Sequence, residues 1–91
     1  SFSDRVNQRL EETAKGLLIE NVEAAGWAAL AGLRQGDILL KIDGVVVPDV
    51  TVLEKRMLKI VEAQAKRIIF FVKRGIHTLF VRLEPDWEDD P

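Results

Sequence analysis

The side chains that most often perform catalysis are too few and too scattered in this 91-residue sequence to form a catalytic centre. It has one histidine, His77, and no cysteine. Its two serines, Ser1 and Ser3, lie at the N-terminus, where chains are often poorly fixed. A nucleophilic serine must be held beside a histidine that a carboxylate orients. No acid lies within two residues of His77 in its predicted strand, so we expect this side chain to face solvent and expect no catalytic residues.

Ligands for metals and phosphates are also lacking. A metal site needs several His, Cys, Asp or Glu side chains that converge on one point. The densest group of acids is a C-terminal run, which is normally solvated: Glu84, Asp86, Glu88, Asp89 and Asp90. The six glycines never form the G-x-x-x-x-G-K loop that cradles phosphates. The sequence therefore predicts no metal and no cofactor, and favours a binding or structural module over an enzyme.

The charge distribution does not favour nucleic acid as a partner. The net charge is −2, but without the acidic run residues 1–83 carry 10 acids against 13 bases. A nucleic-acid surface would interleave its bases with aromatic residues. The clustered bases have no aromatic residue among them: Lys55, Arg56, Lys59, Lys66 and Arg67. We therefore interpret this cluster as the solvated face of a helix.

Length and hydropathy limit the chain to one small domain. A hydrophobic fraction of 47% and a charged fraction of 31% are typical of a globular protein. We expect a single domain over residues 1–84 and an acidic tail or linker over residues 85–91. The longest apolar run, Ile68–Val72, is far shorter than the roughly 20 residues of a membrane-spanning helix, so we expect no direct membrane insertion. The first residues lack the pattern of a signal peptide.

Hydrophobic periodicity predicts six strands, which alternate polar and apolar residues or are rich in branched side chains. The predicted strands are residues 5–10, 17–22, 38–42, 45–47, 67–73 and 76–83. Residues 11–15 are predicted to form a turn that closes at Gly16. Asp43-Gly44 favours a tight hairpin turn, because both residues tolerate a positive φ.

Two helices separate these strands. The first spans residues 27–31 and ends at Gly32. The second spans about residues 50–65, and two starts compete for it: Asp49 caps it, or Thr51 and Glu54 form a capping box. We favour Asp49. One face of this helix should meet the core: Leu53, Met57, Ile60, Val61 and Gln64.

The resulting element order is β-β-α-β-β-α-β-β. Hairpins join most neighbouring strands, so the sheet should be mostly antiparallel. We therefore expect an α+β fold in which a small, mostly antiparallel β-barrel or sandwich is capped by two helices.

Four segments in the first half of the chain form a recognisable set of motifs: Gly16–Val22, Ala28-x-x-Ala31-Gly32-Leu33, Gly36–Leu39 and Ile42-Asp43-Gly44. Together they resemble the PDZ domain. The spacing fits the family without a gap, and the resemblance covers roughly residues 5–84. Because a strand opens the chain and a hairpin closes it, the chain is similar to the circularly permuted PDZ type of bacterial HtrA-like serine proteases.

The resemblance implies a peptide-binding function. A partner's C-terminus or extended segment would add as a strand between the first strand and the longer helix. It would also imply a larger, periplasmic or extracytoplasmic bacterial protease, whose own protease domain is another potential partner. With Asp49 as the cap, the residues implied to bind the peptide are Asp4, Arg5, Val6, Asn7, Gln8, Leu10, Val50, Glu54 and Met57. With Thr51 as the cap, Val52 and Arg56 would line the helix side instead.

The chain departs from the family pattern in two places. Residues 2–8, which would form the carboxylate-binding loop, contain no glycine. This departure favours the alternative of a structural or docking module whose degenerate groove packs against its parent protein or a second copy. Trp27 stands where the family usually has proline, and we expect it to pack within the domain.

Overall fold

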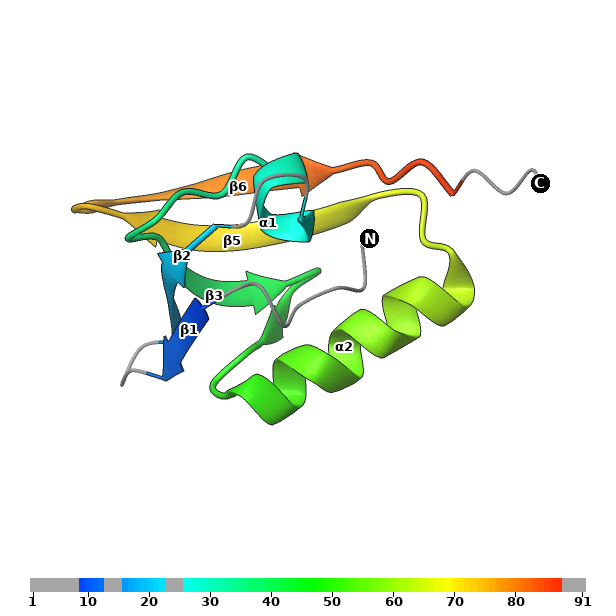
Figure 1. Cartoon of the computed structure of the whole chain (residues 1–91), viewed down its shortest axis with the longest axis horizontal. Helices are drawn as coiled ribbons and strands as arrows, with labels where there is room; N and C mark the ends of the chain where they lie inside the picture. The colour runs from blue at the N-terminus through cyan, green and yellow to red at the C-terminus, as the bar shows by residue number, and fades with distance from the viewer. Residues whose placement is uncertain (1–8, 13–15, 23–25, 88–91) are drawn as a thin grey trace.

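A bent antiparallel sheet packs against one long helix in the computed structural model of the chain (Figure 1). The structure describes residues 9–12, 16–22 and 26–87. The elements follow the order expected from the sequence. They are β1 (Arg9–Glu12), β2 (Leu17–Asn21), α1 (Trp27–Leu30), β3 (Ile38–Ile42), β4 (Val45–Val46), α2 (Val50–Ala63), β5 (Ile68–Arg74) and β6 (His77–Leu83).

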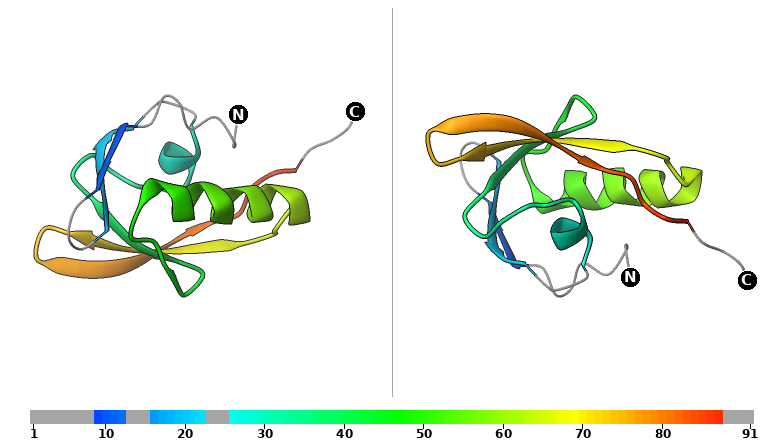
Figure 2. Two further views of the ribbon diagram at one scale, coloured as in Figure 1. Left: turned by 90° about the horizontal axis from the view of Figure 1, so that it is seen from below. Right: turned by 90° about the horizontal axis from the view of Figure 1, so that it is seen from above.

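The sheet is open and has two edges. The strand order is β1-β2-β3-β5-β6, with the short β4 paired to β3, and every pairing is antiparallel. In the described part of the chain, β1 and β6 do not pair with each other, so the expected barrel-like sheet is not closed. Figure 2 shows both helices on one side of the β5–β6 hairpin.

Alternation along β5 separates the core from the outer face of the sheet. Ile68, Phe70 and Val72 are fully buried, whereas the residues between them are only partly buried. The apolar face of α2 packs on this inner side through Leu53, Met57 and Ile60. Burial of each such side chain stabilises the fold by roughly 1.5–3 kcal/mol.

Trp27 packs inside the domain, as expected. It is 1% exposed, and its ring stacks on Phe70 at 5.7 Å between centroids. This contact joins α1 to β5 through the largest buried side chain of the described core. The indole Nε1 has no hydrogen-bond acceptor among the described residues.

Both helices end in the hydrogen-bond pattern that a left-handed residue allows. After α1, Gly32 has φ +84° and the Leu33 amide donates to the Ala28 carbonyl at 2.9 Å. After α2, Gln64 takes the left-handed conformation and the Ala65 amide donates to the Ile60 carbonyl at 3.1 Å. The longer helix therefore ends at Ala63, two residues earlier than expected.

The N-terminal cap of α2 resolves the two starts that the sequence allowed. The Asp49 carboxylate accepts a hydrogen bond from the Val52 amide at 2.9 Å, and Val50 is the first helical residue. This amide would otherwise have no partner in the first turn, so the cap fixes where the helix begins. The preference for Asp49 over Thr51 is confirmed.

The strand bounds lie within one residue of expectation except at β1. The Asp43-Gly44 hairpin turn is confirmed, with positive φ at both residues and Ile42 paired to Val45. Glu11 and Glu12 were expected in a turn, but they belong to β1, because their backbones pair with Leu18 and Leu17 in β2. Residues 5–8 of the expected first strand lie outside the described residues.

Candidate peptide-binding groove

Among the described strands, β1 lies at one end of the sheet. Among the described residues it pairs only with β2, in a register that places Leu10 opposite Ile19. The pairing is irregular between Arg9 and Leu10. A strand with one neighbour presents backbone donors and acceptors along its other side, to which an extended peptide can pair. Figures 1 and 2 place the N-terminal end of α2 beside this end of the sheet.

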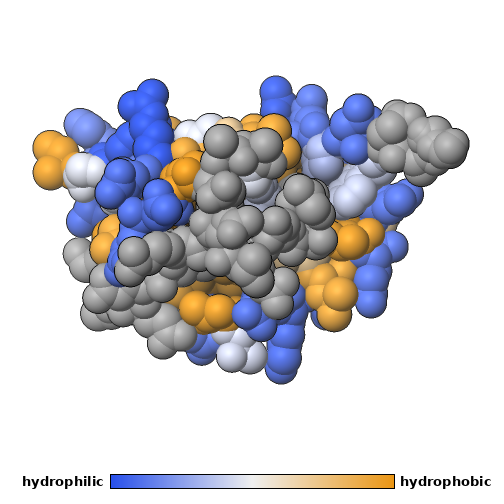
Figure 3. Space-filling model, in the orientation of Figure 1, coloured by the Kyte–Doolittle hydropathy of each residue, from blue (hydrophilic) through white to orange (hydrophobic). Residues whose placement is uncertain are grey.

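Three residues of α2 follow one another at spacings of four and three along the helix, so they share one side of it. Val50 is partly buried and packs against the core, and Met57 is 5% exposed. Glu54 lies between them and is exposed. In Figure 3, apolar surface is visible beside the grey atoms toward both ends of α2. This side of the helix therefore combines apolar side chains with one carboxylate.

The structure describes only part of the predicted site. Leu10 lies in β1 and Val50, Glu54 and Met57 lie on α2. The other predicted residues, Asp4, Arg5, Val6, Asn7 and Gln8, lie outside the described residues, so their part in binding stays a prediction. Because Asp49 caps α2, the alternative register with Val52 and Arg56 on the helix side loses its basis.

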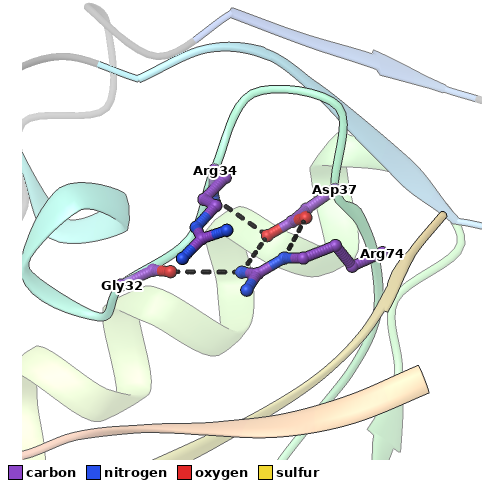
Figure 4. A network of polar contacts seen from close by, with 4 residues as sticks. All are labelled: Gly32, Arg34, Asp37 and Arg74. Carbon is purple, nitrogen blue, oxygen red and sulfur yellow. Dashed lines mark hydrogen bonds and ion pairs between the residues drawn. The ribbon is translucent and has the colours of Figure 1, made fainter. Parts of the chain in front are cut away.

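The turn before β3, which belongs to the segments that resemble the PDZ domain, has a structural role. Asp37 is 1% exposed, and one of its carboxylate oxygens accepts a hydrogen bond from the Arg34 amide at 2.9 Å. Arg74 of β5 donates to both carboxylate oxygens at 2.8 Å and to the Gly32 carbonyl at 3.2 Å (Figure 4). This two-point contact ties the turn before β3 to the last residue of β5.

The electrostatics of this cluster follow from its contacts. Burial alone would raise the pKa of Asp37, but the hydrogen bonds from Arg74 and the Arg34 amide, together with the two guanidinium charges, lower it overall. The same hydrogen bond from Arg74 to Asp37 raises the pKa of Arg74. Both groups therefore stay charged at neutral pH. Sequence reasoning found Asp37 but missed Arg74, which lies 37 positions away.

The described residues contain no group of three or more His, Cys, Asp or Glu side chains placed to hold a metal ion. His77 is exposed at the start of β6, as expected. None of the described helices is both long and apolar enough to cross a membrane.

Comparisons with known proteins agree on the fold. The family model for the PDZ domain matches residues 2–65. No curated protein matches the sequence significantly. Among solved structures, the HtrA3 PDZ domain bound to a phage-derived ligand (FGRWV) superposes with a TM-score of 0.65 at 23% identity, over 82% of this chain and 67% of that one.

Two structures of the PDZ domain of EpsC from Vibrio cholerae are also similar. The one of residues 204–305 has a TM-score of 0.60 at 17% identity and covers 85% of this chain and 76% of that one. The one of residues 219–305 has a TM-score of 0.59 at 18% identity and covers 85% and 92%. At these identities the structural likeness shows the fold, while the family model spans more than half of the sequence. This chain therefore belongs to the PDZ domain family.

Proposed function

We propose that this domain binds C-termini or extended segments of other proteins by adding them as a strand along β1, opposite α2. PDZ domains are non-catalytic modules that bind peptides. The observation that carries the proposal is the open edge of β1 beside the N-terminal end of α2. Backbone pairing along such an edge supplies affinity, and the side chains of the facing helix supply specificity.

The side chains on α2 support an apolar ligand. Val50 is partly buried and packs against the core, and Met57 is 5% exposed, so an apolar ligand would meet the hydrocarbon of Val50 first and the thioether of Met57 only at the floor of the groove. Methionine adapts to side chains of different shape, so it suits a site that accepts several apolar residues. The HtrA3 PDZ domain is bound to a ligand that ends in tryptophan and valine, which fits the same chemistry.

We further propose that the domain is the substrate-recognition or regulatory module of a larger bacterial protease. The permuted element order and the likeness to the HtrA3 PDZ domain support this context. Reading the gene product around this segment tests it directly. A Ser-His-Asp protease domain on the same polypeptide is the expected finding, and a parent protein of another class would contradict it.

Titration of the chain with the peptide FGRWV tests the binding proposal, with the C-terminally amidated peptide as the control. The free acid should bind saturably, and amidation should weaken it by on the order of tenfold, since it removes charge-assisted hydrogen bonds. Val50→Lys should weaken binding by a similar factor because it places a cation on the apolar side of α2. Lys55→Ala, on the exposed face of the helix, is the matched control and should bind as the parent chain does.

Lack of saturable binding by a folded chain, both to FGRWV and to a library of apolar C-terminal peptides, would contradict this function. The result would favour the alternative docking module with a degenerate groove. The absence of glycine from residues 2–8 is the observation behind that alternative.

A further inference from the structure

The outer face of the sheet carries a row of exposed side chains on the side opposite α2. Strand pairing places Val46 opposite Lys41, Lys41 opposite Phe71, and Phe71 opposite Phe80. Directly opposed residues point to the same face of a sheet, so these four side chains cross β4, β3, β5 and β6 in one line. We call this line the outer row. In Figure 2 both helices lie on the other side of the β5–β6 hairpin.

Two of the five exposed large hydrophobic side chains among the described residues lie in this row. Phe80 is 71% exposed and Val46 is 59% exposed, while Phe71 is partly buried. The rings of Phe71 and Phe80 pack together at 4.8 Å between centroids with a tilt of 39°. Single exposed apolar residues are ordinary, but a contiguous group with two aromatic rings indicates an interaction surface.

Cations surround the aromatic pair. The ammonium of Lys41 lies 6.0 Å from the centroid of the Phe71 ring. Lys73 and Arg82 belong to the same outer face by alternation along β5 and β6. Two acids lie near this face: Glu84 pairs with Arg82 at 3.5 Å, and Asp43 accepts a hydrogen bond from the Ile69 amide at 2.8 Å. The face is therefore apolar in its centre and carries three cations against two carboxylates, with Lys41 beside the aromatic pair.

This composition separates the possible occupants. A nucleic-acid base needs an open aromatic face, but Lys41 lies over one side of Phe71 and Phe80 packs beside it. An anionic membrane surface is recognised by clusters of about four to eight Lys or Arg, more than this face carries. In a symmetric dimer, the patch would meet its own positive charges. The remaining occupant is a polypeptide with carboxylates beside apolar side chains, which complements the face in both respects.

We propose that the outer row is a second protein-docking surface, which binds an acidic polypeptide segment that inserts an aromatic or aliphatic side chain against Phe71 and Phe80. The carboxylates of that segment pair with Lys41. Since the row lies on the face of the sheet away from α2, the domain can hold this partner and a groove peptide at the same time.

The test uses a peptide that alternates aspartate and phenylalanine, with both termini blocked so that no free carboxylate can enter the groove. Binding to the 91-residue chain is followed by NMR amide shifts. Saturable shifts should concentrate in β3, β5 and β6. Phe80→Ser should weaken binding on the order of fivefold or more, and Lys41→Glu should weaken it about threefold. Leu58→Ser, a 57% exposed position on α2, is the matched control and should leave the affinity unchanged.

Four results would overturn the proposal. The first is no saturation at about 1 mM peptide with a folded chain. The second is equal binding of a peptide in which lysine replaces aspartate. The third is binding to phosphatidylserine vesicles that Phe80→Ser abolishes, without binding to the acidic peptide. The fourth is concentration-dependent dimerisation, seen by sedimentation, that Phe80→Ser prevents. If Phe80→Ser proves unfolded by circular dichroism, the charge reversal at Lys41 and the lysine peptide still decide the question.

Discussion

Asp37 is the one charged side chain among the buried residues that the structure describes, and it remains ionised because Arg74 meets it at two points. A buried carboxylate without a partner would lose several kcal/mol of solvation. Arg74 is only partly withdrawn from water, at 29% side-chain exposure, so it brings its charge to the site at a lower cost. At the scale of single residues, the pair therefore acts as a cross-link between the segment before β3 and the end of β5.

This pair predicts an acid-dependent loss of stability. The pKa of Asp37 is lower in the folded chain than its ordinary value near 4, so its contribution is complete above that value and is lost as the pH falls through the folded pKa. Urea unfolding between about pH 2 and pH 7 measures this effect. The unfolding free energies of the parent chain and Asp37→Asn should converge as the pH falls below about 4. A constant difference between the two across that range would contradict the prediction.

Arg74→Ala isolates the other half of the pair. It leaves the Asp37 carboxylate buried with only the Arg34 amide, so the free energy of unfolding should fall by about 3 kcal/mol at neutral pH. Arg34→Ala is the matched control, because the hydrogen bond that residue 34 gives Asp37 comes from the backbone. It should change stability by less than about 1 kcal/mol. Equal effects of the two variants in urea unfolding would exclude a special role for Arg74.

Gly16 illustrates a residue whose missing side chain is required. A Cβ at this position would lie 2.2 Å from the Leu39 carbonyl oxygen, a backbone atom that cannot rotate away. Gly16→Ala should therefore lower the free energy of unfolding by about 3 kcal/mol. Gly75→Ala, where no atom lies within 4 Å of the new Cβ, should cost only about 1–2 kcal/mol from its positive φ. Thermal unfolding ranks the two, and the reverse order would refute the steric explanation.

At the scale of elements, periodicity predicted most of the fold because the core-facing pattern is local. The strand over residues 38–42 and the first residue of α2 were predicted correctly. Most other bounds differ from the prediction by one or two residues. β1 was misplaced because Glu11 and Glu12 have a polar pattern typical of a turn, whereas their backbones pair with β2. Neither local composition nor alternation reports such pairing, which depends on the partner strand.

The C-terminal end of α2 carries a conformational cost that can be removed. Gln64 has φ +48° and ψ +54°, a region that glycine occupies without strain. Gln64→Gly should raise the free energy of unfolding by about 0.5–1 kcal/mol. Glu62→Gly, two residues earlier and inside the helix, should lower it by about 1 kcal/mol. Urea unfolding of both variants checks the opposite signs, and destabilisation by Gln64→Gly would show that the side chain matters more than the backbone.

At the scale of the whole molecule, the contacts that sequence reasoning missed join segments far apart in the chain. Arg74 reaches Asp37 across 37 positions, and the outer row depends on the register of three strand pairs. The start of α2 could be predicted because capping by Asp49 is local. The strand order also separates the two proposed surfaces, since the proposed groove lies along β1 and the outer row crosses β4, β3, β5 and β6.

Trp87, near the C-terminus, also contacts a segment that is distant in the sequence. The Trp87 indole Nε1 donates to the Ala65 carbonyl at 2.7 Å, and the ring packs on the core just beyond the end of α2. Trp87→Phe should lower the free energy of unfolding by about 1 kcal/mol through the lost hydrogen bond. Trp87→Ala should lower it by about 2 kcal/mol, because packing is lost as well. Asp86→Ala, at an exposed neighbour, should stay within about 0.5 kcal/mol.

The same variants test where the folding unit ends, which sequence analysis placed at residue 84. If residues 85–91 are only a tail, chains ending at Glu84 and at Trp87 should unfold at the same temperature. If Trp87 anchors the end of α2, the shorter chain should match Trp87→Ala and unfold several degrees below the longer one. Asp86→Ala should leave the melting temperature unchanged, because its side chain is exposed.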